Sequence, residues 1–588
     1  MRNEAEAEPR LKHALELDPS LRLAYDHYYR LLRKRNDTLG LLDLLRGRLG
    51  VVSDTKERCR LYYEQAILFR SIGNLDECNQ SVKHILASDP KHVGALALLA
   101  ETSTMLEQWD TAVTVLRQLA DAEVPVSQRR LSRLTVANIL ERKKNDPKAA
   151  LTELALLEQS NGIDDELLMR SAQIAERIGD YPYAITKWEQ LSHRTSGIDR
   201  AAYQKRIARI YAHNLHNQAK AMQAYQAALQ SNPADTEACE ELINHTLNPQ
   251  VVHQLIFDVR QHLYRMLDPN PLEPTALRKL LRAAVWAKDL DRQQAILDVL
   301  VILGLASDEE HNQWSELRPQ SSHVLEGMFD NDMVQHITAL PASGPADSVL
   351  KILAQTLGNK PSHELKRLGV ERSHRIKNKT PCNQRDELLM LCSAFQVNVS
   401  EVYLGGHTRE GIAALGDSKS CTWVIGTEIT SPLTPISRFA VGQLLYGLKT
   451  GLVPLMRRQS NQVAAIMFDV AEAMQFMFPQ SVSYFDQEHL APGIMQNLTS
   501  KARRTLDALW PQIELSGQPI VDRCHALERS AMRTGLLLAN DLDAVLRFVV
   551  GPLLDSAHIV ASELATDLVR FWISDEASLL RKQLGIAR

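Results

Sequence analysis

Two columns of small residues recur along the first half of the chain at nearly constant intervals. The first column holds Ala66, Ala100, Ala137, Ala172 and Ala208, which are 34, 37, 35 and 36 residues apart. The second column follows 12 or 13 residues later in each unit, at Cys78, Ala112, Ala149, Ala184 and Ala221. Small side chains that face each other let two antiparallel helices approach closely. We therefore expect each unit to be a helix pair that meets at these positions.

Turn and stop signals separate the expected helices. Between the two columns of each unit lies a turn, at Gly73-Asn74, Gln108-Trp109, Asn145-Asp146, Gly179-Asp180 and His216-Asn217. Asp-Pro or Asn-Pro pairs follow helical segments at Pro19, Pro90, Pro233 and Pro269, where proline stops a helix because it lacks the N–H and clashes with the preceding turn. One helix pair cannot bury its apolar face alone, so the pairs are predicted to stack into an α-solenoid.

These features resemble tetratricopeptide repeats (TPRs). The best units are Arg58–Pro90 and Asp165–Gly197, and the pattern covers residues 55–235. Residues 21–54 and 236–305 keep helical periodicity with degraded columns, so we assign a TPR-type solenoid of about eight helix pairs to residues 1–318. Ala7 and Ala14 match a second helix without its first, which indicates an incomplete first unit and a sequence truncated at its N-terminus.

The TPR resemblance implies a binding surface. In such arrays the first helix of each unit lines a concave groove, and most arrays use it to hold a protein or a peptide; the alternative is a merely solvated surface. The expected groove residues are Tyr63, Ile67 and Arg70 in one unit and Glu166, Met169, Gln173 and Arg177 in another.

Composition limits the other partners. The 67 basic and 71 acidic residues give a net charge of −4, which predicts no general attraction to nucleic acid or to an anionic membrane. The basic stretch Arg372–Lys379 is short and has no interleaved aromatic residue, so a solvated loop is the favoured interpretation. Seven scattered cysteines without a C-x-x-C motif suit a reducing compartment, and the N-terminus is no signal peptide. We expect no membrane insertion and a cytoplasmic location.

The second half of the chain follows another pattern. Residues 319–384 are assigned to a helical connector and residues 385–588 to a mostly helical α+β domain. Three short apolar runs, Glu401–Leu404, Gly411–Leu415 and Cys421–Ile425, predict a small antiparallel sheet. A helix is then expected over Thr434–Gly451, because a proline stands at its start. The predicted fold class is mainly α.

This order resembles the HtpX-like and CAAX-protease-like zinc metallopeptidases (gluzincins), in which a three-strand meander leads into a helix that carries H-E-x-x-H. The matching segment here is Ala440–Leu448. Gly442 and Tyr446 stand at the two histidine positions and Gln443 at the catalytic glutamate position. Glu528 begins ERSAM, which is similar to the family's E-x-x-A-D. The whole chain also resembles large bacterial multi-repeat proteins that end in such a degenerate domain.

The substitutions argue against catalysis. Glycine offers zinc no ligand, a tyrosine hydroxyl is rarely deprotonated, and glutamine cannot act as a general base. We therefore expect no catalytic residue, no metal, no cofactor and no enzymatic activity. An unrelated helical domain with a short hairpin is the alternative structure. The predicted function is a non-catalytic interaction scaffold with a pseudopeptidase domain, and the alternative function is an active hydrolase that recruits its substrate through the repeats.

Overall fold

The computed structural model describes residues 2–161, 164–246, 248–318, 325–340, 344–358, 361–377, 380–407, 409–478, 491–516 and 519–587. Side chains are described except those of residues 2–6, 160–161 and 361–363. The chain is mainly α-helical, as predicted, and its contacts divide it into two compact units, Met1–His245 and Thr246–Arg588.

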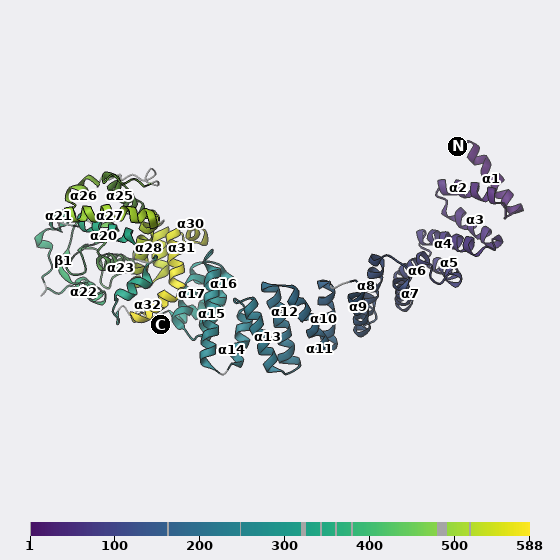
Figure 1. Cartoon of the computed structure of the whole chain (residues 1–588), viewed down its shortest axis with the longest axis horizontal. Helices are drawn as coiled ribbons and strands as arrows, with labels where there is room; N and C mark the ends of the chain where they lie inside the picture. Colours follow the sequence, from purple (N-terminus) through teal and green to yellow (C-terminus); the bar gives the residue numbers. More distant parts are fainter. Residues whose placement is uncertain are drawn as a thin grey trace. The chain divides into compact units, whose positions relative to one another are not determined.

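Unit 1 is an array of helix pairs that follow one another in chain order (Figure 1). A single helix, α1 (Arg2–Leu17), precedes the first pair and α14 (Thr236–His245) follows the last. The pairs are α2 (Arg22–Lys34) with α3 (Thr38–Val51), α4 (Thr55–Ser71) with α5 (Leu75–Ser88), α6 (Val93–Met105) with α7 (Trp109–Asp121), α8 (Val126–Arg142) with α9 (Pro147–Asn161), α10 (Asp165–Ile178) with α11 (Tyr181–Arg194), and α12 (Gly197–Arg209), extended by the π-turn η1 (Ile210–Asn214), with α13 (Gln218–Ser231).

One turn geometry joins the helices of every pair. A residue with positive φ ends the first helix, at Asn36, Gly73, Glu107, Asn145, Gly179 and His216. The next residue caps the second helix in most pairs; the Asn74 side chain, for example, accepts a hydrogen bond from the Glu77 N–H. Left-handed backbone favours glycine, asparagine and histidine, and the predicted turn pairs coincide with these positions except at Gln108-Trp109, where the turn begins at Glu107.

The two small-residue columns lie inside the helix pairs, as predicted. All members of the first column are buried, and in the second column Cys78, Ala112, Ala184 and Ala221 each lie five residues after the left-handed residue and are fully buried. Ala149 was assigned one position too early: it is half-buried, whereas Ala150 lies five residues after Asn145 and is fully buried. The extra residue in the α8–α9 turn, Lys144, shifts the spacing.

Unit 2 begins with α15 (Pro249–Leu267), the pair α16 (Pro274–Trp286) and α17 (Leu290–Ile302), and α18 (Asp308–Leu317). The α16–α17 turn has the same geometry as those of unit 1, with Lys288 left-handed and Asp289 as the cap. The further helices are α19 (Asn331–Ile337), α20 (Pro345–Leu357), α21 (Pro361–Arg367), η2 (Arg372–His374), α22 (Asn383–Ala394), α23 (Pro435–Thr450), α24 (Val453–Met456), α25 (Ser460–Ala473), α26 (Ala491–Asn497), α27 (Ser500–Ser516), α28 (Ile520–Ala539), α29 (Leu542–Val550), α30 (Ser556–Ala561), α31 (Glu563–Ile573) and α32 (Asp575–Gln583).

A three-stranded sheet of unit 2 has the order β1-β3-β2, with β1 (Val399–Leu404), β2 (Ile412–Gly416) and β3 (Cys421–Ile425). The strands coincide with the three predicted runs, but the sheet is mixed: β2 and β3 are antiparallel, whereas β1 and β3 are parallel. The expected antiparallel meander is therefore wrong in its first pairing. The connection from β1 to β2 is long enough to carry β2 past β3, so that β3 becomes the central strand.

The unit boundary lies at residue 245, whereas the sequence analysis ended the solenoid at residue 318. Helix α17 packs against α29 and α31, and two buried side chains tie it to α32: Arg581 Nε and Nη2 donate to the two Asp291 carboxylate oxygens at 2.8 and 2.9 Å. Trp572 Nε1 also donates to Asp298. The helices α15 to α18 therefore share a core with the C-terminal helices.

Candidate functional site

The first helices α4, α6, α8, α10 and α12 of unit 1 expose a row of side chains that we call the first-helix face. In α4, Ile67 is 43% exposed, and the Tyr63 ring lies 5.5 Å from the His92 ring at the start of α6. The Tyr63 hydroxyl is so close to Gly94 that a Cβ there would be 2.8 Å from it. Gly94 thus makes room for the Tyr63 ring on this face.

The predicted groove residues of α10 also lie on this face. Glu166, Gln173 and Arg177 are exposed, and Met169 is half-buried against the core. Arg177 forms an ion pair with Glu141 of α8 at 3.0 Å, and Arg70 of α4 forms one with Glu101 of α6 at 2.5 Å. The two predicted groove arginines therefore already have partners on the neighbouring pair.

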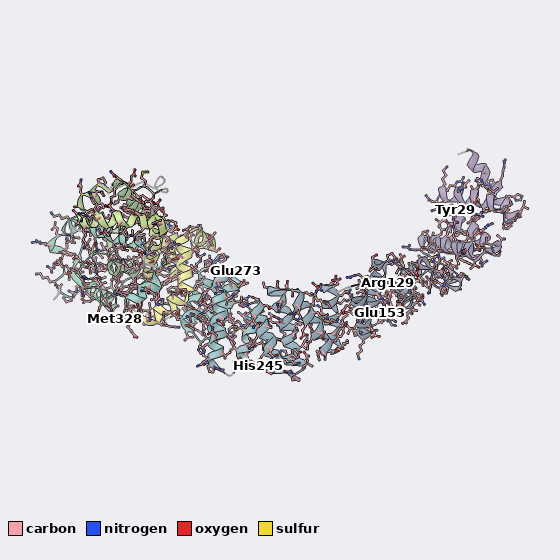
Figure 2. All side chains as sticks on the ribbon, in the orientation of Figure 1. Tyr29, Arg129, Glu153, His245, Glu273 and Met328 are labelled. Carbon is pink, nitrogen blue, oxygen red and sulfur yellow. The ribbon has the colours of Figure 1, made fainter. Side chains whose placement is uncertain are left out.

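Such ion pairs recur between successive first helices. Arg206 of α12 pairs with Glu176 of α10 at 3.0 Å, and Lys205 pairs with Glu237 of α14 at 3.0 Å. On the second-helix side of the array, Glu153 of α9, labelled in Figure 2, accepts from Arg117 at 2.7 Å and from Arg133 at 3.0 Å. Exposed pairs contribute at most about 1 kcal/mol each, so their main effect is to hold charged groups in place.

Three apolar residues of the first-helix face were missed by the sequence analysis. Leu131 of α8 is 65% exposed and Met105 of α6 is 61% exposed, while Leu134 of α8 is half-buried against the core. Leu131 lies six residues before Ala137, as Glu166 lies six residues before Ala172. The offset from the small-residue column could therefore have identified it. The first-helix face therefore carries exposed apolar residues on α4, α6 and α8.

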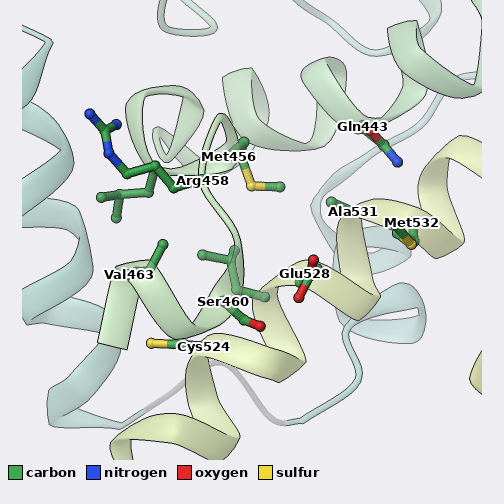
Figure 3. A pocket seen from close by; sticks show the side chains of 11 residues that line it. Gln443, Met456, Arg458, Ser460, Val463, Cys524, Glu528, Ala531 and Met532 are labelled. Atoms are coloured by element: carbon green, nitrogen blue, oxygen red, sulfur yellow. The ribbon is translucent and has the colours of Figure 1, made fainter. Parts of the chain in front are cut away.

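A small pocket of unit 2 contains two of the four predicted degenerate-site residues (Figure 3). Gln443 reaches it from α23 and Glu528 from α28, while Arg458 lines it from the segment between α24 and α25 and Ser460 from the start of α25. Its volume is about 90 Å³, well below the several hundred Å³ typical of ligand sites. It can hold water molecules but not a peptide.

Gly442 and Tyr446 do not face this pocket. Gly442 lies where α23 crosses α28, and a Cβ at this position would be 2.7 Å from the Thr534 carbonyl oxygen. A histidine there would clash with the α28 backbone. Tyr446 is buried, which raises the pKa of its hydroxyl, and it hydrogen-bonds with the Ser530 and Thr338 side chains. Tyr446 therefore does not line the pocket that contains Glu528.

The pocket's other reactive groups are a thiol and a hydroxyl. Burial raises the pKa of the Cys524 thiol to about 12, so the thiol is protonated and unreactive near neutral pH. The Ser460 Oγ lies 2.9 Å from His525 Nδ1. Within the described residues, no three histidine, cysteine, aspartate or glutamate side chains converge as a metal site. No helix among these residues could span a bilayer.

No protein-family model matches the sequence, and no curated protein matches it. Solved repeat proteins match parts of the chain. The structure of YrrB, "a TPR protein with an unusual peptide-binding site", is 18% identical and covers 31% of this chain and 89% of its own, with a TM-score of 0.22. The structure of MamA protein is 16% identical and covers 33% of this chain and 98% of its own, with a TM-score of 0.21. The TPR2AB domain of yeast Sti1 in its pHSP90 complex is 12% identical and covers 45% of this chain and 99% of its own, with a TM-score of 0.23. Scores of this size support no transfer of a partner or an activity.

Proposed function

We propose that the protein is a non-catalytic scaffold that holds a protein or peptide partner on the first-helix face of unit 1. The exposed apolar residues of this face carry the proposal. Ile67, Met105 and Leu131 are exposed there, while flanking arginines and glutamates are held in ion pairs. Exposed apolar groups bordered by fixed charges are typical of interaction surfaces.

Glutamate substitutions test this face without touching the ion pairs. Ile67→Glu and Leu131→Glu, alone and together, replace exposed apolar side chains of this face with carboxylates. Affinity capture with quantitative mass spectrometry should show at least an about tenfold loss of the specific partners, because a charge buried at an interface lacks a counter-ion. Leu39→Glu on α3 and Leu156→Glu on α9 are matched controls, since both leucines are exposed on second helices. Equal capture by the double variant and the controls would refute the proposal.

We further propose that residues 385–588 are a pseudopeptidase domain without hydrolytic activity, from the bacterial class of repeat proteins that the sequence resembles. Support comes from the sheet that precedes α23, from Gln443 and Glu528 in one pocket, and from the absence of zinc ligands at 442 and 446. Elemental analysis of the purified protein should find no stoichiometric zinc. Stoichiometric zinc, or chelator-sensitive peptide cleavage, would refute this part.

The alternative function is hydrolysis with substrate recruited by the repeats, and the Ser460–His525 contact is the observation that favours it. A serine beside a histidine is a nucleophile–base arrangement. The small pocket volume and the near-complete burial of Ser460 oppose it. We expect no labelling of Ser460 by a fluorophosphonate probe, and labelling abolished by Ser460→Ala would establish the hydrolase instead.

A further inference from the structure

A cavity of about 660 Å³ lies in unit 2 between α20–α21, strand β2 and α23–α24. Its size is within the range of ligand-binding pockets. Its apolar lining combines the buried Leu415 and Val453 with half-buried side chains, namely Leu357, Leu368, Ile412, Ala413, Leu444 and Pro454. The cavity therefore offers apolar surface that no part of the described chain covers completely.

Strand β2 forms one side of this cavity and is an edge strand, because the order is β1-β3-β2. The hydrogen bonds show which of its residues face outward. The Gly426 N–H donates to the Gly411 carbonyl. Because hydrogen-bonded residues alternate along an antiparallel strand, the backbone N–H and C=O groups of Gly411, Ala413 and Leu415 point toward β3. Ile412 and Ala414 consequently direct their backbone N–H and C=O groups away from β3. Ile412 lines the cavity, whereas Ala414 is fully buried beside it.

The two edges of the sheet are not equivalent. At the β1 edge, the Ile376 N–H donates to the Val402 carbonyl at 2.9 Å, so the segment around Arg375 covers that edge. At the β2 edge, the Arg457 Nη2 donates to the Ala414 carbonyl at 3.0 Å. Among the described residues, no partner meets the Ile412 N–H and C=O or the Ala414 N–H. Open backbone groups of this kind template the addition of another strand.

The charge of the cavity lining indicates which side chains a bound strand would carry. Three arginines line the cavity, Arg367, Arg457 and Arg458, against one acid, Glu364. Arg457 is tied to one Glu364 carboxylate oxygen at 2.7 Å, and the 73% exposed Arg367 side chain lies 4.0 Å from the other. The lining therefore has a net positive charge, which favours a carboxylate on the occupant.

We propose that the β2 edge and its cavity form a second binding site, for an extended peptide that carries apolar side chains and one carboxylate. The peptide adds as a strand beside β2, pairing with the Ile412 N–H and C=O and with the Ala414 N–H. One of its apolar side chains enters the cavity beside Leu444, and its carboxylate meets Arg367. This site lies on unit 2 and does not depend on the first-helix face.

Synthetic heptapeptides with alternating valine or leucine and threonine provide the probe. One series has an internal glutamate and an amidated C-terminus, a second has a free C-terminal carboxylate only, and a third has neither. Fluorescence polarisation with the full-length protein should show binding of the first or the second series, which identifies the source of the carboxylate. The third series should bind at least about tenfold more weakly, as one charge-assisted hydrogen bond predicts.

Backbone methylation tests the strand geometry. Two peptides are compared, one methylated at the amide nitrogens of its odd-numbered residues and one at those of its even-numbered residues. One of them should lose binding and the other should keep it, because only every second residue directs its N–H toward β2. Equal effects of the two methylation patterns, or no binding by any peptide series at 1 mM peptide, would overturn the proposal.

Variants of the protein test the site itself. Leu444→Trp fills the cavity, and Ile412→Pro removes an outward N–H that the β2–β3 ladder does not use. Arg367→Glu reverses the exposed charge. Each should weaken binding of the acidic series at least about tenfold. Leu515→Trp, at a leucine that is 86% exposed on α27, is the matched control. Circular dichroism verifies folding, and retained binding by all three folded variants would overturn the proposal.

Discussion

At the scale of single residues, glycine decides how closely α23 and α28 approach. A Cβ on Gly442 would be 2.7 Å from the Thr534 carbonyl oxygen, and a Cβ on Gly535 would be 2.7 Å from the Phe439 carbonyl oxygen. Each glycine thus faces the backbone of the other helix, which cannot move aside as a side chain can. The position that the sequence pattern linked to a lost zinc ligand is occupied for a packing reason.

Gly442→Ala should therefore destabilise the protein by about 1–3 kcal/mol, because the added methyl group forces the two helices apart. Urea-induced unfolding of the full-length chain, followed by tryptophan fluorescence, measures the change. Gly493→Ala on α26 is the control, since a Cβ there meets no atom within 4 Å. This control should be neutral or slightly stabilising, as alanine is the better helix former. A neutral Gly442→Ala would contradict the close crossing.

The α8–α9 pair allows a second comparison between adjacent residues. Ala150 is fully buried five residues after Asn145, whereas Ala149 is half-buried. Ala150→Leu should cost about 1–3 kcal/mol through overpacking, and Ala149→Leu should cost less. Thermal unfolding of the two variants distinguishes them. The opposite ranking would restore the register that the sequence spacing first indicated.

At the scale of elements, buried ion pairs join α32 and the loop before it to α15 and α17. Arg581 and Asp291 are 3% and 4% exposed and form two hydrogen bonds. Asp575, at the start of α32, accepts from Arg260, Gln261 and Tyr264 of α15. Such pairs favour one arrangement of the helices, because a displaced partner leaves a charge buried alone.

Asp291→Ala should cost about 3–5 kcal/mol, because Arg581 remains buried without its counter-ion. The double variant Asp291→Leu/Arg581→Met removes both charges and should recover much of this loss. Chemical denaturation of the unmodified protein, the single variants Asp291→Leu and Arg581→Met and the double variant gives the coupling between the two positions. If the double variant is as unstable as the sum of its single variants, the pair is not coupled.

At the scale of the whole molecule, the last repeat-like helices belong with the C-terminal helices. Residues on nearly all sides of α17 are buried, since α16, α29, α31 and α32 contact it. A chain cut after residue 318 would expose this surface together with the buried Asp291 carboxylate. A cut at residue 245 would follow the division between the compact units.

The fragments 1–245 and 246–588 should therefore each fold and stay monodisperse in size-exclusion chromatography. The fragments 1–318 and 319–588 should aggregate or show reduced thermal stability, because both halves of one core are exposed. Circular dichroism and light scattering compare the four fragments. A stable, monodisperse fragment 1–318 would show that the C-terminal helices are dispensable for α15 to α18.

Much of the repeat array was predictable because its determinants are local. The columns at Ala66 and Cys78, the turn at Gly73 and the cap at Asn74 all lie within one unit of about 35 residues, and helix pairs depend on contacts at that separation. The small-residue columns are degraded in α2–α3, as the sequence analysis stated. Tyr29 stands at the first-column position and Leu41 at the second-column position of this pair, and neither residue is small. The exposed Leu131 was predictable from the same columns, although the analysis did not use them in that way.

The sequence by itself thus determined the helix pairs, their period and the three strands. Only the tertiary structure decided the parallel β1–β3 pairing, the role of Gly442 against Thr534, and the attachment of α17 to α32 through Asp291 and Arg581. These three features join residues that are 21 or 22, 92 and 290 positions apart. Helix and strand propensity and residue spacing depend on neighbours along the chain. These three contacts instead depend on how elements that are distant in the sequence pack against one another in the core.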